Sequence, residues 1–442
     1  MIQISKGGSS KFGGLRWWVV GLIALATIIN YIDRTSFNIL WPDIFKELYP
    51  SMNFDGHKEL YTYISITFLL SYAFGQAIFG KIFDWIGTRL GFALSIGVWS
   101  IATVLHAFAR GVLSFGIFRS ILGIAEAGNW PGAAKGNAEW FPTKERAFAQ
   151  GIFNSGAAIG GMIAFPIISL MSVYMDWQWI FVAIGVLGFL WLIPWMYLVK
   201  SPPKDHPWIS DAERDYILSG QQNQDINEDG TYDDGYNPST GQLLGHKESW
   251  GVILASAAID PIWWLFVFWI PGYLMEVYGM DVKNVGIYAW VPYVGAMVGA
   301  WFGGLLAQNR LKAGWNVNRT RKTVIILGCI IMLPGLLGLS NPGGPVNAVL
   351  IMAVILFGFQ TAIGNIQTLP SDFFSGKTVG TLSGIAGMAA KLMGGFLLYF
   401  IPWLTSGGNY FPAFVIGAGL ALFVMLAIIL LCPNIKPLKG NY

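Results

Sequence analysis

Residues 80–89 read GKIFDWIGTR and join two long apolar runs, near residues 60–80 and 90–109. Glycines in this stretch permit a tight turn, and Asp84 can cap a neighbouring helix and pair with a basic residue. Each flanking run approaches or reaches the length of about 20 apolar residues that a helix needs to cross a bilayer. The stretch therefore predicts a short turn between two transmembrane helices.

The same length rule predicts twelve transmembrane helices. They lie near residues 16–41, 60–80, 90–109, 112–135, 147–172, 177–199, 252–278, 285–308, 323–340, 347–370, 379–404 and 411–432. Barrel strands would be short and alternating, and these runs are neither. The predicted fold is an all-α membrane protein with two six-helix halves, residues 1–199 and 250–442, joined by a linker at 200–249. A weak repeat relates residues 80–84 to residues 304–308.

Composition excludes several other classes of protein. Only 12% of the 442 residues are charged, half the ~25% typical of soluble domains, so lipid is the expected main solvent. A net charge of +3 is too small to suggest nucleic-acid binding. Cys329 and Cys432 lie in apolar segments, and the four histidines are scattered. We therefore expect no disulfide framework, no metal site, no cofactor and no enzyme motif.

The basic residues predict how the chain lies in the membrane. Twenty Lys and Arg side chains fall in the connections on the side of the two termini, and four fall on the opposite side. The positive-inside rule then places both termini in the cytoplasm of a cell with this protein in its inner membrane. The remaining three basic residues, Arg34, Arg119 and Lys391, fall inside predicted spans.

The linker contains two recognisable patterns. Ser210 to Glu213 reads as a capping box that opens a short amphipathic helix on the cytoplasmic surface. Residues 225–236 resemble the opening of a calcium-binding loop, but Tyr236 stands where the pattern needs a bidentate Glu. A solvated acidic linker is the preferred interpretation, and we expect residues 224–241 to be dispensable.

Residues 80–89 resemble the signature loop of the major facilitator superfamily, and Gly80, Asp84, Gly87 and Arg89 are assigned to a conformational gate. Further motifs resemble the anion:cation symporters within it, and among these the hexuronate transporters. The motifs are Asn30-Tyr31-Ile32-Asp33-Arg34, the stretch from Arg119 to Gly132, residues 139–156, residues 260–274 and residues 360–374. The resemblance covers nearly the whole chain. It departs from the family at the acidic insert, at Gly272, where a basic residue is expected, and at Lys391.

Five ionisable residues are expected near the middle of the bilayer. They are Asp33, Arg34, Arg119, Glu126 and Lys391. A charge at mid-bilayer costs about 2.5–3.5 kcal/mol on insertion scales, so function is favoured over a purely structural pairing. The five sum to +1 when ionised, which a monovalent carboxylate would neutralise. Arginine suits that ligand because its planar fork binds a carboxylate bidentately.

The resemblance implies roles for several of these residues. Asp33 and Glu126 would be the proton-coupling acids, and Arg34 and Arg119 would link protonation to substrate. Candidate groups for recognising substrate hydroxyls are Tyr31, Tyr72, Gln76, Asn154, Gln360 and Asn365. Each of these six is as readily explained by a hydrogen bond between helices.

Lys391 is interpreted from its position in the span 379–404, where its ammonium group cannot reach either interface. We expect it to meet the substrate from the C-terminal half, and the alternative is a structural pair with Asp33 or Glu126. The overall prediction is a monomeric, proton-coupled symporter for a small organic anion, most simply a hexuronate or related sugar acid. Sodium coupling, another carboxylate substrate, a passive channel and a membrane enzyme remain the alternatives.

Overall fold

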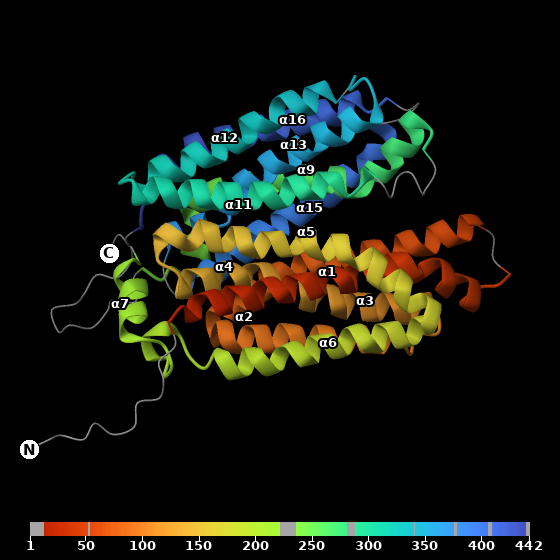
Figure 1. Ribbon diagram of the computed structural model, residues 1–442, viewed down its shortest axis with the longest axis horizontal. Helices are drawn as coiled ribbons and strands as arrows, with labels where there is room; N and C mark the ends of the chain where they lie inside the picture. The colour runs from red at the N-terminus through yellow and green to blue at the C-terminus, as the bar shows by residue number, and fades with distance from the viewer. Residues whose placement is uncertain are drawn as a thin grey trace, which may run out of the picture.

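A computed structural model of the protein shows a bundle of long helices (Figure 1). It describes residues 13–51, 54–221, 236–280, 288–339, 341–374, 378–404 and 409–438. The described residues form helices and connections and contain no strand, which confirms the expected all-helical fold.

The first half is built from helices α1 to α6. They are α1 (Leu15–Leu48), α2 (Phe54–His106), α3 (Val112–Glu126), α4 (Asn129–Trp140), α5 (Thr143–Tyr174) and α6 (Trp177–Leu198). A 3-10 turn (Pro203–Asp205), α7 (Asp211–Ser219) and α8 (Thr240–Gly245) belong to the linker region. The second half contains α9 (Lys247–Tyr278), α11 (Val291–Lys312), α12 (Val317–Gly338), α13 (Pro345–Ile366), α14 (Leu369–Phe373), α15 (Val379–Leu404) and α16 (Phe411–Leu431).

Several expected spans differ from the observed helices in where they break. The expected spans 60–80 and 90–109 form the single element α2, and the turn between them is reduced to one non-helical residue, Gly87, with φ 79°. Only glycine adopts that left-handed backbone readily. The expected span 112–135 is instead divided between α3 and α4. The first of these breaks falls inside the turn expected at residues 80–89, whereas the expected span 112–135 contains no break.

Eight helices of the described chain are long and apolar enough to cross a membrane. They cover nine of the twelve expected spans, since α2 covers two. The expected spans 112–135, 285–308 and 379–404 correspond to α3 with α4, α11 and α15, which are helical but rich in glycine and polar residues. Two of them, α4 and α15, border the central pocket described below.

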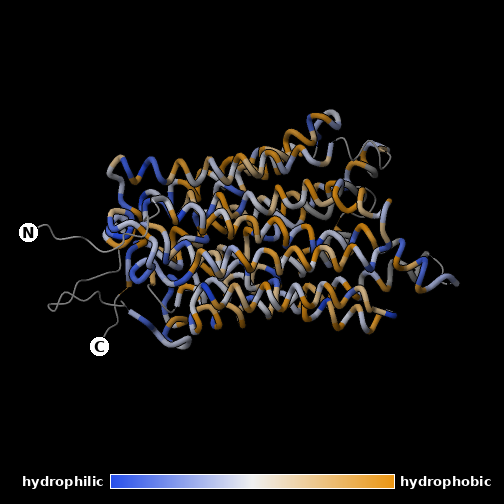
Figure 2. The backbone as a smooth tube through the Cα atoms, turned by 60° about the horizontal axis from the view of Figure 1, so that its bottom comes forward, coloured by the Kyte–Doolittle hydropathy of each residue, from blue (hydrophilic) through white to orange (hydrophobic). Residues whose placement is uncertain are grey.

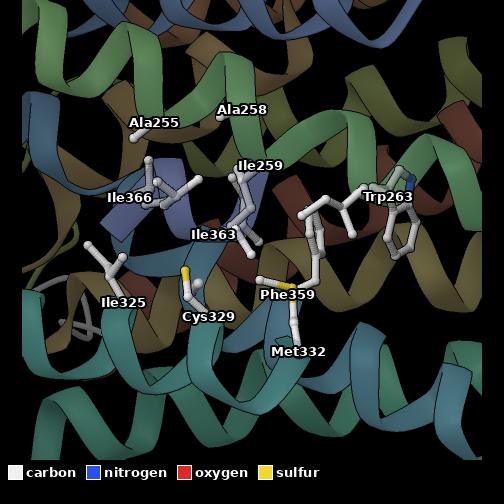
Figure 3. Close-up of a cluster of buried hydrophobic side chains, with 14 of the residues drawn as sticks. Ala255, Ala258, Ile259, Trp263, Ile325, Cys329, Met332, Phe359, Ile363 and Ile366 are labelled. Atoms are coloured by element: carbon white, nitrogen blue, oxygen red, sulfur yellow. The ribbon is translucent and has the colours of Figure 1, made fainter. Parts of the chain in front are cut away.

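The hydrophobic core is divided in the same way as the sequence. Two clusters of buried apolar residues draw on positions 15–217, and another draws on positions 243–435. Figure 3 shows part of the latter, where Trp263 of α9 lies near Phe359 of α13, with Met332 and Cys329 of α12 beside them. The Trp263 and Phe359 rings stack with centroids 5.5 Å apart. Each half therefore has its own core, as expected for two related six-helix units.

The outer surface is strongly apolar. Figure 2 shows hydrophobic segments along the length of the helices and hydrophilic ones gathered most densely at the end that holds both termini. On α16, Leu426 and Leu430 are 55% and 67% exposed, and on α6 Ile193 is 66% exposed. Soluble proteins rarely expose such continuous apolar surface. These faces are suited to contact with lipid tails.

The two halves meet where glycines remove side chains between crossing helices. A Cβ at Gly80 of α2 would lie 2.3 Å from the Gly380 carbonyl oxygen, and one at Gly384 of α15 would lie 2.3 Å from that of Gln76. In the related position, a Cβ at Gly304 of α11 would lie 2.7 Å from the Phe148 Cα of α5. The weak repeat between residues 80–84 and 304–308 is therefore matched by the packing, because both stretches cross a helix of the other half.

The linker divides its contacts between the halves. Ser210 caps α7 by accepting the Glu213 N–H at 3.2 Å, which confirms the predicted helix start. Glu213 does not complete a capping box but accepts N–H bonds from the start of α1, at Gly14 (2.7 Å), Leu15 (3.0 Å) and Arg16 (3.2 Å). On the other side of the linker, the Tyr236 ring packs on Phe374 with centroids 6.4 Å apart. Residues 222–235, which hold most of the acidic insert and the calcium-loop pattern, lie outside the described residues.

Candidate functional site

Two adjoining pockets lie between the halves and share five lining residues, Trp130, Asp260, Ile363, Gln367 and Lys391. Their walls come from α1, α2, α4 and α5 on one side and from α9, α13 and α15 on the other. This position between two helical bundles is where transporters of this architecture place their substrate.

On the first-half side, Arg34 of α1 lines the pocket and forms an ion pair with Glu126 of α3, which does not itself line it. Arg34 Nη2 lies 3.1 Å from Glu126 Oε2, and Arg34 Nε lies 3.3 Å from the same oxygen. Tyr72 faces the guanidinium at 4.7 Å from its ring centroid. Glu126 Oε1 is buried and has no partner in the described chain. The pair leaves one carboxylate oxygen to carry a proton and places an arginine at the edge of the pocket.

Asp33 and Arg119 lie behind that pair. Thr103 of α2 donates its hydroxyl to Asp33 Oδ2, while Asp33 Oδ1 and Arg119 Nε are buried without a partner among the described residues. The Arg119 guanidinium instead lies over the Phe37 ring, 4.1 Å from its centroid. Neither side chain lines the two pockets. The arginine that contacts Glu126 is therefore Arg34 and not Arg119.

The wall from the second half contains a second ion pair. Lys391 Nζ lies 2.6 Å from Asp260 Oδ2, and the Trp264 indole N–H donates to the same oxygen at 2.7 Å. The partner of Lys391 is therefore Asp260, and the expected structural alternatives, Asp33 and Glu126, are wrong. With Asp260 included, the site contains three acids and three bases, so the expected net charge has to be corrected. The six ionised groups sum to zero rather than to the expected +1.

Amide side chains form a polar bridge across the pocket floor. Gln367 Oε1 of the second half accepts from Gln150 Nε2 at 2.8 Å and from Asn154 Nδ2 at 3.0 Å, both on α5. Gln76 and Gln360 also line the pockets, and their Oε1 atoms are buried without a partner in the part of the chain described. Buried acceptors of this kind cost free energy unless a ligand or water satisfies them.

The other candidates for hydroxyl recognition fall in different places. Tyr31 lines the pocket beside Arg34, with the guanidinium 5.1 Å from its ring centroid. Tyr72 contacts the pocket only through Arg34. Asn365 lies away from both pockets, where its Oδ1 accepts from Arg321 Nη1 at 3.3 Å and its Nδ2 donates to the Gly303 carbonyl at 3.4 Å.

The residues assigned to a gate lie at the end of the bundle that holds the termini. Asp84 accepts backbone N–H bonds from Gly380, at 2.9 Å, and from Thr381 at the start of α15. Lys135 Nζ lies 3.1 Å from Asp84 Oδ1. The predicted helix cap and basic partner of Asp84 are both observed. The hydrogen bonds of Arg89 stay within the first half, where its carbonyl accepts the Trp195 indole N–H at 3.0 Å and its Nη2 donates to the Met196 carbonyl at 3.4 Å.

Two arginines absent from the sequence-based prediction also bridge the halves at this end. Arg146 donates to the Ser371 carbonyl of the second half at 2.9 Å, and Arg321 donates to the Thr143 carbonyl of the first half at 3.3 Å. Arg321 is fully buried and paired with Asp372, with Nε 2.7 Å from Oδ2. These hydrogen bonds, one donated by each half to the other, therefore join the halves at the end of the pocket nearest the termini.

Asp260 could have been found by the argument applied to Lys391, because it lies inside the expected span 252–278. Trp130, Gln150, Trp264 and Gln367 carry no such signal. Tryptophans and amides are common in membrane helices, and only the fold shows which of them converge on one pocket.

Comparisons with known proteins agree with this arrangement. The family model described as Major Facilitator Superfamily matches residues 23–398. The chain is 32% identical to a hexuronate transporter of Escherichia coli (strain K12) over 418 residues, which cover 94% of this chain and 93% of the relative. It is 33% identical to a galacturonate transporter of Dickeya chrysanthemi over 333 residues, 74% of this chain and 92% of the relative.

A more distant relative and a solved structure extend the comparison. A D-galactonate transporter of Escherichia coli O6:H1 is 29% identical over 431 residues, 97% of this chain and 98% of the relative. The structure of the proton:xylose symporter XylE superposes with a TM-score of 0.72, covering 95% of this chain and 96% of that one at 14% identity. At that identity the likeness concerns the fold alone.

Proposed function

The chain belongs to the major facilitator superfamily, a family of multi-pass membrane transporters and not of enzymes, and from this premise we propose that it is a proton-coupled symporter. Its substrate would be a small organic anion, a hexuronate or a related sugar acid, imported by alternating access. The substrate class is supported by the hexuronate, galacturonate and galactonate transporters among its relatives.

The observation that carries the proposal is the pairing of Arg34 with Glu126 at the edge of a pocket between the halves. The Glu126 carboxylate has no exposed surface, and the Arg34 side chain retains 14%. A proton on Glu126 would remove its charge and release the guanidinium to bind a substrate carboxylate bidentately. Loss of the anion would restore the pair and favour release of the proton.

The charge balance supports the same coupling. The six ionised groups around the pocket sum to zero, so a monovalent anion entering alone would leave one uncompensated negative charge in a dry site. Uncompensated charge at membrane depth is costly. Entry of one proton with the anion keeps the site neutral. Glu126 and Asp33 are suited to receive it, since each has a buried oxygen without a partner in the described part of the chain.

Alternating access requires an end of the pocket that closes and opens. Asp84, Arg146 and Arg321 join the halves at the terminus end in this conformation. We propose that this end faces the cytoplasm of a cell with the protein in its inner membrane, since it is also the end with the excess of Lys and Arg. One polypeptide supplies both walls of the pocket, so a monomer suffices for transport.

Uptake into proteoliposomes tests this function. Purified protein reconstituted with an inward proton gradient should accumulate radiolabelled galacturonate or glucuronate above the outside concentration, and a protonophore should abolish the accumulation. Accumulation driven by an imposed sodium gradient at equal pH would overturn proton coupling. Flux that never exceeds equilibrium would instead indicate a passive channel, and accumulation of a non-sugar carboxylate in preference to all sugar acids would overturn the substrate class.

A further inference from the structure

The second half contributes to the pocket a set of groups to which the transport cycle above assigns no contact with the substrate. They are Asp260 and Trp264 on α9 and Lys391 on α15, together with Trp130, which reaches them from α4 of the first half. Lys391 Nζ lies 5.2 Å from the Trp264 ring centroid and 5.9 Å from that of Trp130. The ammonium group thus lies between two indole rings and against one carboxylate.

This set retains hydrogen-bonding capacity on the pocket side. Both described bonds of Asp260 end on Oδ2, and a carboxylate offers about four acceptor positions on two oxygens. Lys391 has three N–H groups, and one described hydrogen bond uses a single one of them. Oδ1 of Asp260 and two donors of Lys391 therefore remain for a ligand that offers both hydroxyl donors and acceptors.

The rings are held in fixed positions. The Trp264 indole is bonded to Asp260 one helical turn earlier on α9, and Gly394 of α15 leaves room for it, since a Cβ there would lie 2.9 Å from Trp264 Cδ1. Trp130 packs edge-on against Phe153 with centroids 4.8 Å apart. Rigid aromatic faces favour a ligand with a flat apolar face of its own.

We propose that Asp260, Lys391, Trp130 and Trp264 form a subsite for the closed ring of a sugar acid, with its hydroxyls on the Asp260–Lys391 pair and its C–H face on an indole. This rests on the proposed function, in which Arg34 takes the carboxylate from the opposite wall of the same pocket. A pyranose presents adjacent hydroxyls and an apolar face at once, whereas an open-chain acid rotates about each carbon bond and loses more entropy on binding. The substrate class is therefore the cyclic hexuronates rather than the open-chain aldonates and aldarates.

Binding to purified protein in detergent tests the subsite without requiring transport. The ligands are glucuronate, galacturonate, a 1-deoxy hexuronate whose ring cannot open, gluconate, galactonate and glucarate, each titrated by calorimetry at one pH. The better hexuronate and its locked-ring analogue should bind within about tenfold of each other, and the open-chain acids at least about tenfold more weakly, a difference of about 1.4 kcal/mol. Equal or tighter binding of any open-chain acid, or loss of binding with the locked ring, would overturn the proposal.

Variants then test the residues. Asp260→Asn and Lys391→Met should each weaken hexuronate binding by at least about tenfold, because each removes a charged hydrogen-bond partner, and should reduce the preference for ring over chain. Lys322→Met, which makes the same substitution outside the pocket, is the matched control and should bind as the wild type does. If an Asp260 or Lys391 variant unfolds, Trp264→Phe is the second variant, and unchanged ring preference in it would reject the aromatic platform.

The two proposals fail separately. If ring selectivity is observed in detergent but no proton gradient drives accumulation, the subsite stands and the coupling is wrong. If accumulation is driven by protons but open-chain acids bind as well as rings, the function stands and the subsite is wrong.

Discussion

Arg34 and Arg119 differ in what surrounds their guanidinium groups. Arg34 is paired with Glu126 through two nitrogens, whereas the Arg119 guanidinium lies over the Phe37 ring and its Nε is buried with no partner among the described residues. A planar, weakly hydrated group stacks on an aromatic ring in a way that an ammonium group does not. At the scale of single residues, the shape of the cation is therefore as important as its charge.

We predict that Arg119→Lys impairs uptake nearly as severely as Arg119→Ala. Lysine keeps the charge but loses both the stacked contact with Phe37 and the fork that can bind a carboxylate. Initial uptake rates in proteoliposomes, normalised to the amount of inserted protein, provide the measurement. Uptake by the lysine variant at the wild-type rate would mean that Arg119 supplies charge alone.

At the scale of elements, glycines determine how closely two helices of different halves cross. On α2, Gly80 meets the backbone of α15 so closely that an added Cβ would lie 2.3 Å from the Gly380 carbonyl oxygen. At Gly97, no atom of the described residues lies within 4 Å of such a Cβ. The same helix thus offers one glycine that is required for a crossing and one that faces open space.

We predict that Gly80→Ala slows transport while Gly97→Ala has little effect. The extra methyl group at Gly80 forces α2 and α15 apart, a change that costs about 1–3 kcal/mol in a packed interface. Uptake rate and thermal stability in detergent should both fall for the first variant. Equal behaviour of the two variants would show that the close crossing is not needed for the conformational cycle.

The linker helices suggest where the two moving units separate. Glu213 fixes α7 to the start of α1, and Gly220 accepts the Thr143 N–H of α5 at 2.9 Å. Beyond the undescribed segment, Tyr236 bonds His246 at 3.2 Å, and Ser239 caps α8. We propose that the boundary between the units falls within residues 222–235, so residues 236–241 are part of the second unit.

We predict that deletion of residues 224–235 preserves uptake. A deletion extended to residue 241 should lower thermal stability, because it removes the contacts of Tyr236 and the α8 cap, worth about 1 kcal/mol. The sequence-based expectation of a dispensable segment at residues 224–241 is therefore limited to residues 224–235. Loss of transport in the shorter deletion, with the protein correctly inserted, would contradict the boundary.

At the scale of the whole molecule, composition and apolar runs predicted an all-helical bundle with two halves, because lipid imposes length and polarity on every span. The motif at residues 80–89 even predicted the cap and basic partner of Asp84. The pocket was less predictable. Arg34, Glu126 and Lys391 were found as charges in apolar surroundings, but the pairing of Lys391 with Asp260 depends on how α9 and α15 pack, which no local pattern encodes.

The most direct test of the central claim compares the wild type with Glu126→Gln, which mimics the protonated acid. With an inward proton gradient, the wild type should accumulate labelled hexuronate, and the variant should not. In vesicles preloaded with unlabelled substrate, both should exchange it for labelled substrate, since the glutamine variant leaves Arg34 free to bind the carboxylate. Accumulation by the variant at the wild-type level under the same gradient would contradict proton coupling through the Arg34–Glu126 pair.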